Sequence, residues 1–153
     1  MSAVSFVPPV FGAVAGYAAG GSTGSYVATV DKFLFTTDAR STLATGLSSA
    51  RYGAAGFASS ENGYAAGGDT GSNVATVDKF LFTTDARSTL GTGLSSARSG
   101  AAGFASAENG YVAGGDTGSY VATVDKFLFT TDARSTLGTG LSAARRYAAG
   151  FAG

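Results

Sequence analysis

The sequence predicts an all-β fold, a β-propeller of four-stranded antiparallel blades, with three blades' worth of sequence in the chain. The first observation is an internal repeat: Tyr17, Tyr64 and Tyr111 stand 47 residues apart, and only five positions differ between residues 17–63 and 64–110. The second is residue content, because each unit is rich in glycine and β-branched residues and has no apolar stripe of helical period. A period of about 40–50 residues is typical of a propeller blade or a helical pair, and the residue content excludes the helical pair.

Each unit divides into four extended segments separated by turn sequences. In the copy that begins at Gly100, we expect strands over 100–105, 111–115, 121–131 and 136–141, with turns at AENG, DTGS and DARS. The first segment consists of Gly and Ala with one Phe, which suits the centre of a ring, where little side-chain volume fits. The third is bulky on both faces, as a strand between two neighbouring blades must be.

The phenylalanines follow the repeat and are therefore expected in the core. Nine of the eleven stand at repeat-equivalent positions. These are Phe33, Phe35, Phe57, Phe80, Phe82, Phe104, Phe127, Phe129 and Phe151.

One further pattern carries a family resemblance. In ARSGAAGFASAENGYVAGGDTGSYVATVDKFLF, an arginine precedes a small-residue strand, and an aromatic residue, a double glycine and a V-x-x-aromatic strand follow. This order resembles the kelch repeat and recurs in all three copies, although Leu43, Leu90 and Leu137 stand near the place of the kelch tryptophan. The resemblance implies a propeller fold and binding without catalysis. The sequence is also similar to repeat proteins of bacteria and their viruses, including tail components, which implies an extracellular or virion-surface location.

Composition excludes several function classes. The chain has no histidine and no cysteine, which removes the commonest general base, thiol nucleophiles and the usual zinc ligands. Ten basic and ten acidic residues balance, so we expect no nucleic-acid partner. Each GDTGS turn supplies one carboxylate, from Asp69 or Asp116, too few for calcium. We expect no catalytic residues, no cofactor, no metal site and no membrane span.

The charged residues Asp31, Lys32, Asp38 and Arg40 recur in all three units. A catalytic site normally breaks repeat symmetry, so we interpret them as turn formers, strand-edge charges or pairs between blades.

The two termini are complementary in the repeat frame. Residues 5–16, SFVPPVFGAVAG, stand where a first strand belongs, but Pro8 and Pro9 cannot donate ladder hydrogen bonds. Residues 145–153, RRYAAGFAG, repeat a first strand without the other three. We therefore divide the chain into an apolar arm, 1–15, and three repeats, 16–62, 63–109 and 110–153, with 145–153 a strand that completes a first blade.

Three blades are too few for a closed ring, since propellers have about 4–8 blades. We expect the strand at 145–153 to complete the first blade of another copy, giving a dimer with six blades; a trimer with nine blades or an open filament are the alternatives. The arm is either loosely packed or docked on a neighbour. The predicted contacts between copies are Val4, Phe6, Val7, Val10, Phe11, Ala148, Ala149 and Phe151.

Differences between copies gather in one set of loops. The connections between second and third strands and between fourth and first strands vary, whereas TTDARST is identical in all copies. This predicts either simple loop drift or a surface for a glycan or protein ligand. The predicted ligand contacts are Tyr26, Tyr52, Asn73, Tyr120, Arg146 and Tyr147.

Three functions follow as hypotheses. The first is a non-enzymatic structural protein that self-assembles through exchanged terminal strands. The second is a binding module, lectin-like or adhesin-like, that recognises its ligand through the variable loops. The third is an engineered or recently amplified repeat without an evolved ligand.

Overall fold

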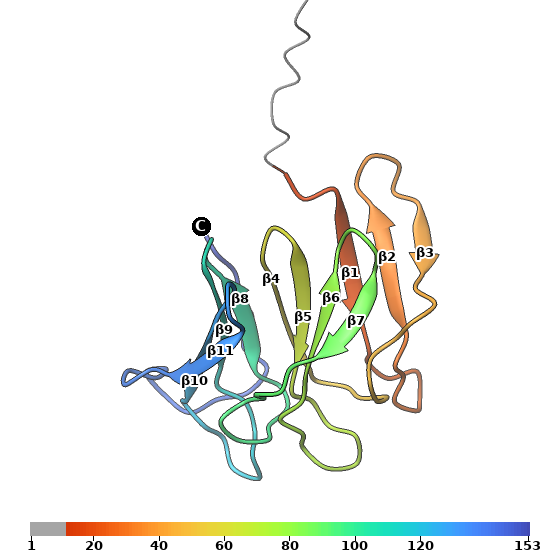
Figure 1. The fold of residues 1–153 in the computed structure, drawn as a ribbon. Coiled ribbons are helices and arrows are strands. Elements are labelled where there is room, and N and C mark those ends of the chain that lie inside the picture. Colours follow the sequence, from red (N-terminus) through yellow and green to blue (C-terminus); the bar gives the residue numbers. More distant parts are fainter. Residues whose placement is uncertain (1–11) are drawn as a thin grey trace, which may run out of the picture.

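The computed structural model describes residues 12–153, which form β-strands in three antiparallel sheets and contain no helix (Figure 1). The all-β prediction is therefore confirmed, as is the prediction of sheets with three or four antiparallel strands. The predicted contacts Val4, Phe6, Val7, Val10 and Phe11 lie outside the described residues.

Each sheet is built from strands that follow one another along the chain, and each strand pairs with the next. The first sheet contains β1 (Ala15–Ala19), β2 (Val30–Leu34) and β3 (Arg40–Thr42). The second contains β4 (Ala55–Ala58), β5 (Asn62–Ala66), β6 (Val77–Leu81) and β7 (Ala86–Thr89). The third contains β8 (Ala102–Ala105), β9 (Asn109–Ala113), β10 (Val124–Leu128) and β11 (Ala133–Thr136).

The last two strands of each unit differ from the sequence prediction. The predicted strand 121–131 is shortened to β10, and the segment DARS, predicted as a turn, contributes to β11. The turn lies earlier because Asp132 adopts a positive φ of 56° and its N–H donates to the carbonyl of Leu128. Arg134 then pairs with Phe127, and the last strand ends at Thr136, the first residue of the predicted strand 136–141.

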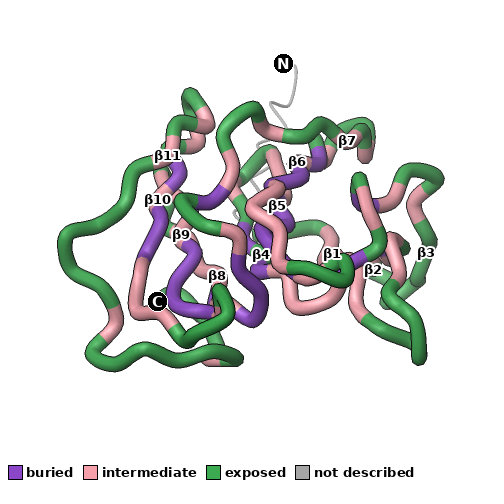
Figure 2. Tube along the Cα trace, turned by 90° about the horizontal axis from the view of Figure 1, so that it is seen from below, coloured by how far each residue is buried: buried purple, intermediate pink, exposed green. Residues whose placement is uncertain are grey.

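The three sheets are arranged in series. Figures 1 and 2 place the first and third sheets on opposite sides of the second, and β4 lies against β8 and β9. Within residues 12–153 the sheets form an open array and do not close into a ring.

Glycine allows the first strands of neighbouring sheets to approach closely. A methyl group on Gly103 in β8 would overlap the backbone carbonyl of Gly56 in β4. Gly150 meets the carbonyl of Gly103 in the same way. The Gly/Ala composition of this segment, predicted to suit the crowded centre, is explained by backbone packed against backbone.

Apolar burial is lower in the first sheet than in the second and third sheets. Buried residues concentrate on the strands of the second and third sheets, whereas much of the first sheet is exposed (Figure 2). The contrast is clearest at one repeat position, where Phe127 is 0% exposed and Phe33 is 40% exposed. Because β-strands of this unit are bulky on both faces, a sheet with one described neighbour leaves apolar surface uncovered.

A fully buried ion pair joins each junction between sheets. The Arg51 guanidinium lies 3.0 Å from the Asp78 carboxylate, and Arg98 lies 3.1 Å from Asp125, with all four side chains inaccessible. Asp78 also accepts hydrogen bonds from the backbone N–H and hydroxyl of Ser48 and from the Thr89 hydroxyl. The arginine that the sequence pattern places before the first strand is therefore a structural residue.

We predict that Gly103→Ala lowers the free energy of unfolding by about 1–3 kcal/mol, because the added methyl displaces packed backbone. The matched control is Gly91→Ala, at a position with open space where the first repeat already carries Ala44. That variant should stay within about 1 kcal/mol of the wild type. Denaturant unfolding of both variants measures the difference, and equal stabilities would contradict the close approach of β4 and β8.

The buried carboxylates predict a loss of stability in acid. Burial by itself raises the pKa of Asp78, but hydrogen bonds from Ser48 and Thr89 and the charge of Arg51 outweigh it, so the pKa is lowered below 3.8. A lowered folded-state pKa gives stability that is present above the ordinary pKa and is lost as pH falls through the lowered value.

We therefore predict that the free energy of unfolding falls as pH drops below about 4. Asp78→Asn should lower it by about 3–5 kcal/mol at pH 7, because Arg51 is left buried without a counter-charge. The same variant should lose less stability on acidification than the wild type. Unfolding curves at several pH values, with Glu61→Gln in an exposed turn as control, test both effects. An unchanged acid response in Asp78→Asn would be inconsistent with this assignment.

Candidate functional site

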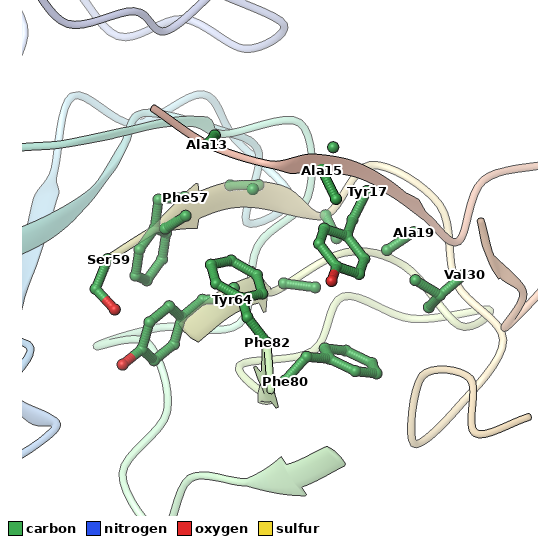
Figure 3. Close-up of a pocket in the computed structure, with 17 residues that line it drawn as sticks. Ala13, Ala15, Tyr17, Ala19, Val30, Phe57, Ser59, Tyr64, Phe80 and Phe82 are labelled. Carbon is green, nitrogen blue, oxygen red and sulfur yellow. The ribbon is translucent and has the colours of Figure 1, made fainter. Parts of the chain in front are cut away.

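A cavity of about 520 Å³ lies between β1 of the first sheet and β4 and β5 of the second (Figure 3). Its wall is apolar: small residues line the strands, and the rings of Tyr17, Phe57, Tyr64, Phe80 and Phe82 surround the space. None of the described residues that line it carries a charge. This cavity, called the β1–β4 cavity below, suits an apolar occupant.

The equivalent space between the second and third sheets is filled by a phenylalanine ring. There, the ring of Phe57 in β4 lies 4.8 Å from the ring of Tyr64, 5.8 Å from Phe127 and 6.3 Å from Phe129. The residues one repeat earlier than these three are Tyr17, Phe80 and Phe82, and all of them line the cavity. Among residues 12–153, no ring occupies the Phe57 position of the first sheet.

The segment 148–152 contains the third copy of that ring. Phe151 is repeat-equivalent to Phe57, yet Phe57 is 7% exposed and Phe151 is 88% exposed. Its neighbour Gly150 packs against Gly103, so the segment runs beside β8 as β8 runs beside β4.

The strand predicted over 145–153 does not form within one chain. A β-strand is defined by its ladder, and no described strand lies next to this segment in the register that pairs β4 with β5. In the single chain, the predicted contacts between copies Ala148, Ala149 and Phe151 are exposed or half-buried.

A second candidate surface lies on the loops along the lower edge of Figure 1. Two of the positions that vary between copies contact each other there. The rings of Tyr26 and Tyr52 lie 4.8 Å apart, and at the equivalent pair in the third unit the Arg146 guanidinium lies 5.0 Å from the Tyr120 ring. The side chains Tyr26, Tyr52, Tyr120, Arg146 and Tyr147 are called the aromatic loop cluster below.

Tyr147 joins the two halves of this cluster. Its ring lies 5.0 Å from Arg146, and the neighbouring Tyr147 hydroxyl raises the pKa of Tyr52. Tyr147 has a φ of 56°, in the left-handed region, where the other copies have Gly53 and Gly100. A tyrosine is strained in that conformation by about 1–3 kcal/mol.

Asn73, also predicted as a ligand contact, does not join the cluster. Its side-chain amide donates a 2.7 Å hydrogen bond to the backbone carbonyl of Asp116 and so links the second and third sheets. Asp116 itself was not predicted, although its carboxylate binds Arg146 at 2.8 Å. The signal was present in the sequence, because the column Ser22/Asp69/Asp116 varies between copies.

The recurring charges form contacts of all three predicted kinds. Asp38, Asp85 and Asp132 adopt a positive φ in their turns, and Arg40 lies at an exposed edge beside Asp31. Lys32 pairs with Asp85 across the first junction between sheets.

The described part of the chain contains neither a candidate metal site nor a candidate membrane-spanning helix. Residues 12–153 bring no three metal-ligating side chains together. No helix there is long and apolar enough to cross a membrane.

Comparison with known proteins adds no family: no protein-family model matches the chain, and no curated protein is similar to it.

Proposed function

We propose that the protein is a non-enzymatic, self-assembling subunit of a kelch-like β-propeller, in which residues 149–152 of one copy form the first strand of another copy's first sheet. The β1–β4 cavity carries this proposal. It is bounded by Tyr17, Phe80 and Phe82, the repeat equivalents of the rings that enclose Phe57. The occupant that the repeat specifies is Phe151, and this ring is exposed in the single chain.

The strand register supports the same docking. In the second sheet, Phe57 pairs with Tyr64 and Ala55 pairs with Ala66. In the proposed docking, Phe151 and Ala149 take the places of Phe57 and Ala55, and Tyr17 and Ala19 of the other copy take the places of Tyr64 and Ala66. Phe151 then pairs with Tyr17 of the other copy, and Ala149 pairs with Ala19. The edge of β1 that is opposite β2 would then gain a ladder, which removes an exposed strand edge.

The outer faces of the array are complementary as well. Phe33 and Phe35 are exposed on the first sheet, whereas Phe80 and Phe127, the equivalents of Phe33, are buried. At the second junction, Phe57 packs on Phe127 and Phe129. Phe104 is the ring that would cover Phe33 and Phe35 of the next copy, so association would bury apolar surface on both sides.

Closure after two chains gives six blades and a ring, closure after three gives nine, and failure to close gives a filament. The dimer agrees best with the blade number of known propellers, which is about 4–8. Repetition of one junction in every blade also leaves no unique constellation for catalysis.

We predict that the wild type sediments as a multiple of 15.0 kDa and that Phe151→Ser shifts it to a monomer. Truncating a buried phenylalanine costs about 3–5 kcal/mol, which corresponds to at least about 100-fold weaker association. Because Phe151 is exposed in one chain, the fold of the monomer should be unchanged.

The control for this experiment is Leu128→Ser. Leu34, Leu81 and Leu128 are all exposed at the same repeat position, so this surface faces no neighbouring sheet. Sedimentation over a concentration series separates the two variants. A wild type that stays monomeric at every concentration, or a Phe151→Ser variant that assembles normally, would refute the proposal.

The aromatic loop cluster favours a second function, binding of a glycan or a protein ligand. Tyrosine rings beside an arginine and an aspartate, as in Tyr120, Arg146 and Asp116, offer stacking surfaces and polar groups together. The strained backbone of Tyr147 supports this function, because residues held in such conformations cluster at binding sites.

We predict that Tyr26→Ala and Tyr120→Ala each remove binding to any sugar that the wild type binds on a glycan array, since each deletes a stacking ring. Thr84→Ala, in an exposed turn outside these loops, is the control and should bind as the wild type does. An array without signal for the wild type, or signal that both tyrosine variants retain, would contradict a glycan-binding role.

A further inference from the structure

The polar contacts between neighbouring sheets follow a fixed offset along the chain. Arg51 binds Asp78, 27 residues later, and Arg98 binds Asp125 at the same offset. A serine three residues before each arginine adds two hydrogen bonds: Ser48 to Asp78 and Ser95 to Asp125, each through backbone N–H and hydroxyl. One carboxylate oxygen, Oδ2, receives all of these contacts.

A second contact, at the other end of the strands, has an offset of 53 residues. Lys32 binds Asp85 at 2.9 Å and Lys79 binds Asp132 at 2.7 Å. The hydroxyls of Tyr17 and Tyr64 donate to these two carboxylates as well, each at 3.0 Å.

On the third sheet, the donors of both contacts are present without acceptors. Arg145 and Ser142 stand one repeat after Arg98 and Ser95, and both are exposed. Lys126 and Tyr111 stand one repeat after Lys79 and Tyr64. Among residues 12–153, none of these four side chains forms an ion pair or a side-chain hydrogen bond.

On the first sheet, the matching acceptors are already oriented. Thr42 donates to Asp31 Oδ1 at 2.6 Å, as Thr89 and Thr136 donate to Asp78 Oδ1 and Asp125 Oδ1. Asp31 Oδ2, the oxygen that binds arginine and serine in the other two sheets, has no hydrogen bond from residues 12–153. Asp38 has a φ of 55°, close to the 57° and 56° of Asp85 and Asp132.

We propose that two polar contacts fix the register between copies: Arg145 and Ser142 of one copy bind Asp31 of the next, and Lys126 and Tyr111 bind Asp38 of the next. This inference rests on the proposed self-assembly and names its partner, a second copy of this chain, at the level of side chains. The apolar occupant Phe151 supplies burial, whereas the ion pairs select one register. A strand of Gly and Ala specifies its register only weakly, because a shift of the strand changes the burial of few side-chain atoms.

Burial makes the Arg145 contact the stronger of the two. At the existing junctions, Arg51 and Arg98 are fully inaccessible, whereas Lys32 and Lys79 keep about a fifth of their side-chain surface exposed. A buried charge without its partner is far more costly than an exposed one. Mismatch at Asp31 should therefore disrupt assembly more than mismatch at Asp38.

The test is a charge exchange. Arg145→Asp alone and Asp31→Arg alone should each weaken association by at least about 100-fold, since each would bury two like charges together. A mixture of the two single variants should associate as 1:1 complexes, because the exchanged charges meet at one junction. Sedimentation and mass measurement in native buffer provide the readout, with Glu61→Lys as a charge-reversal control in an exposed turn.

The outcomes separate this inference from the proposed function. If Phe151→Ser blocks assembly but Arg145→Asp does not, strand exchange stands and the polar register is wrong. If both single charge variants stay monomeric and their mixture does too, the pairing of Arg145 with Asp31 is wrong. A wild type that never assembles overturns both. If Asp31→Arg does not fold, Lys126→Glu tests the second contact, with Asp38 of the next copy. This variant should weaken association about tenfold.

Discussion

The structure depends on contact between neighbouring sheets, because each sheet of this repeat is apolar on both faces. A sheet face without a neighbour leaves its phenylalanines exposed, as Phe33 is. The repeat-equivalent Phe127, whose face is covered, is inaccessible. The backbone permits this contact through Gly56 and Gly103, which bring β4 and β8 together without intervening side chains.

Each junction between neighbouring sheets also contains a buried arginine-aspartate pair. A buried arginine-aspartate pair is costly to desolvate, and its attraction offsets that cost only when the remaining polar atoms are satisfied. The Asp78 carboxylate is satisfied by Ser48, Thr89 and Arg51, whereas the Arg51 Nε has no hydrogen-bond partner among the described residues. At each junction the pair thus adds one fully inaccessible ionic contact to the apolar contact between the sheets.

Sequence reasoning recovered the repeat, the all-β class and the number of strands in each sheet, because these depend on local spacing and turn chemistry. It placed the last turn of each unit too late, since DARS resembles a turn as closely as TTDA does. Only the backbone hydrogen bond from Asp132 to Leu128 decides between the two. It also grouped Asn73 with the aromatic side chains, because a column that varies shows no side-chain direction. The Asn73 amide in fact turns toward the Asp116 carbonyl.

The sequence by itself determined the unit, its strand order and which positions repeat, because 47-residue periodicity is visible without coordinates. It also predicted a first strand at residues 145–153, which does not form within one chain. Tertiary structure alone decided that the first sheet leaves a cavity shaped by Tyr17, Phe80 and Phe82, and that Phe151 is exposed. The reason is physical: the walls of this cavity come from residues far apart in sequence, brought together by packing that local patterns do not encode.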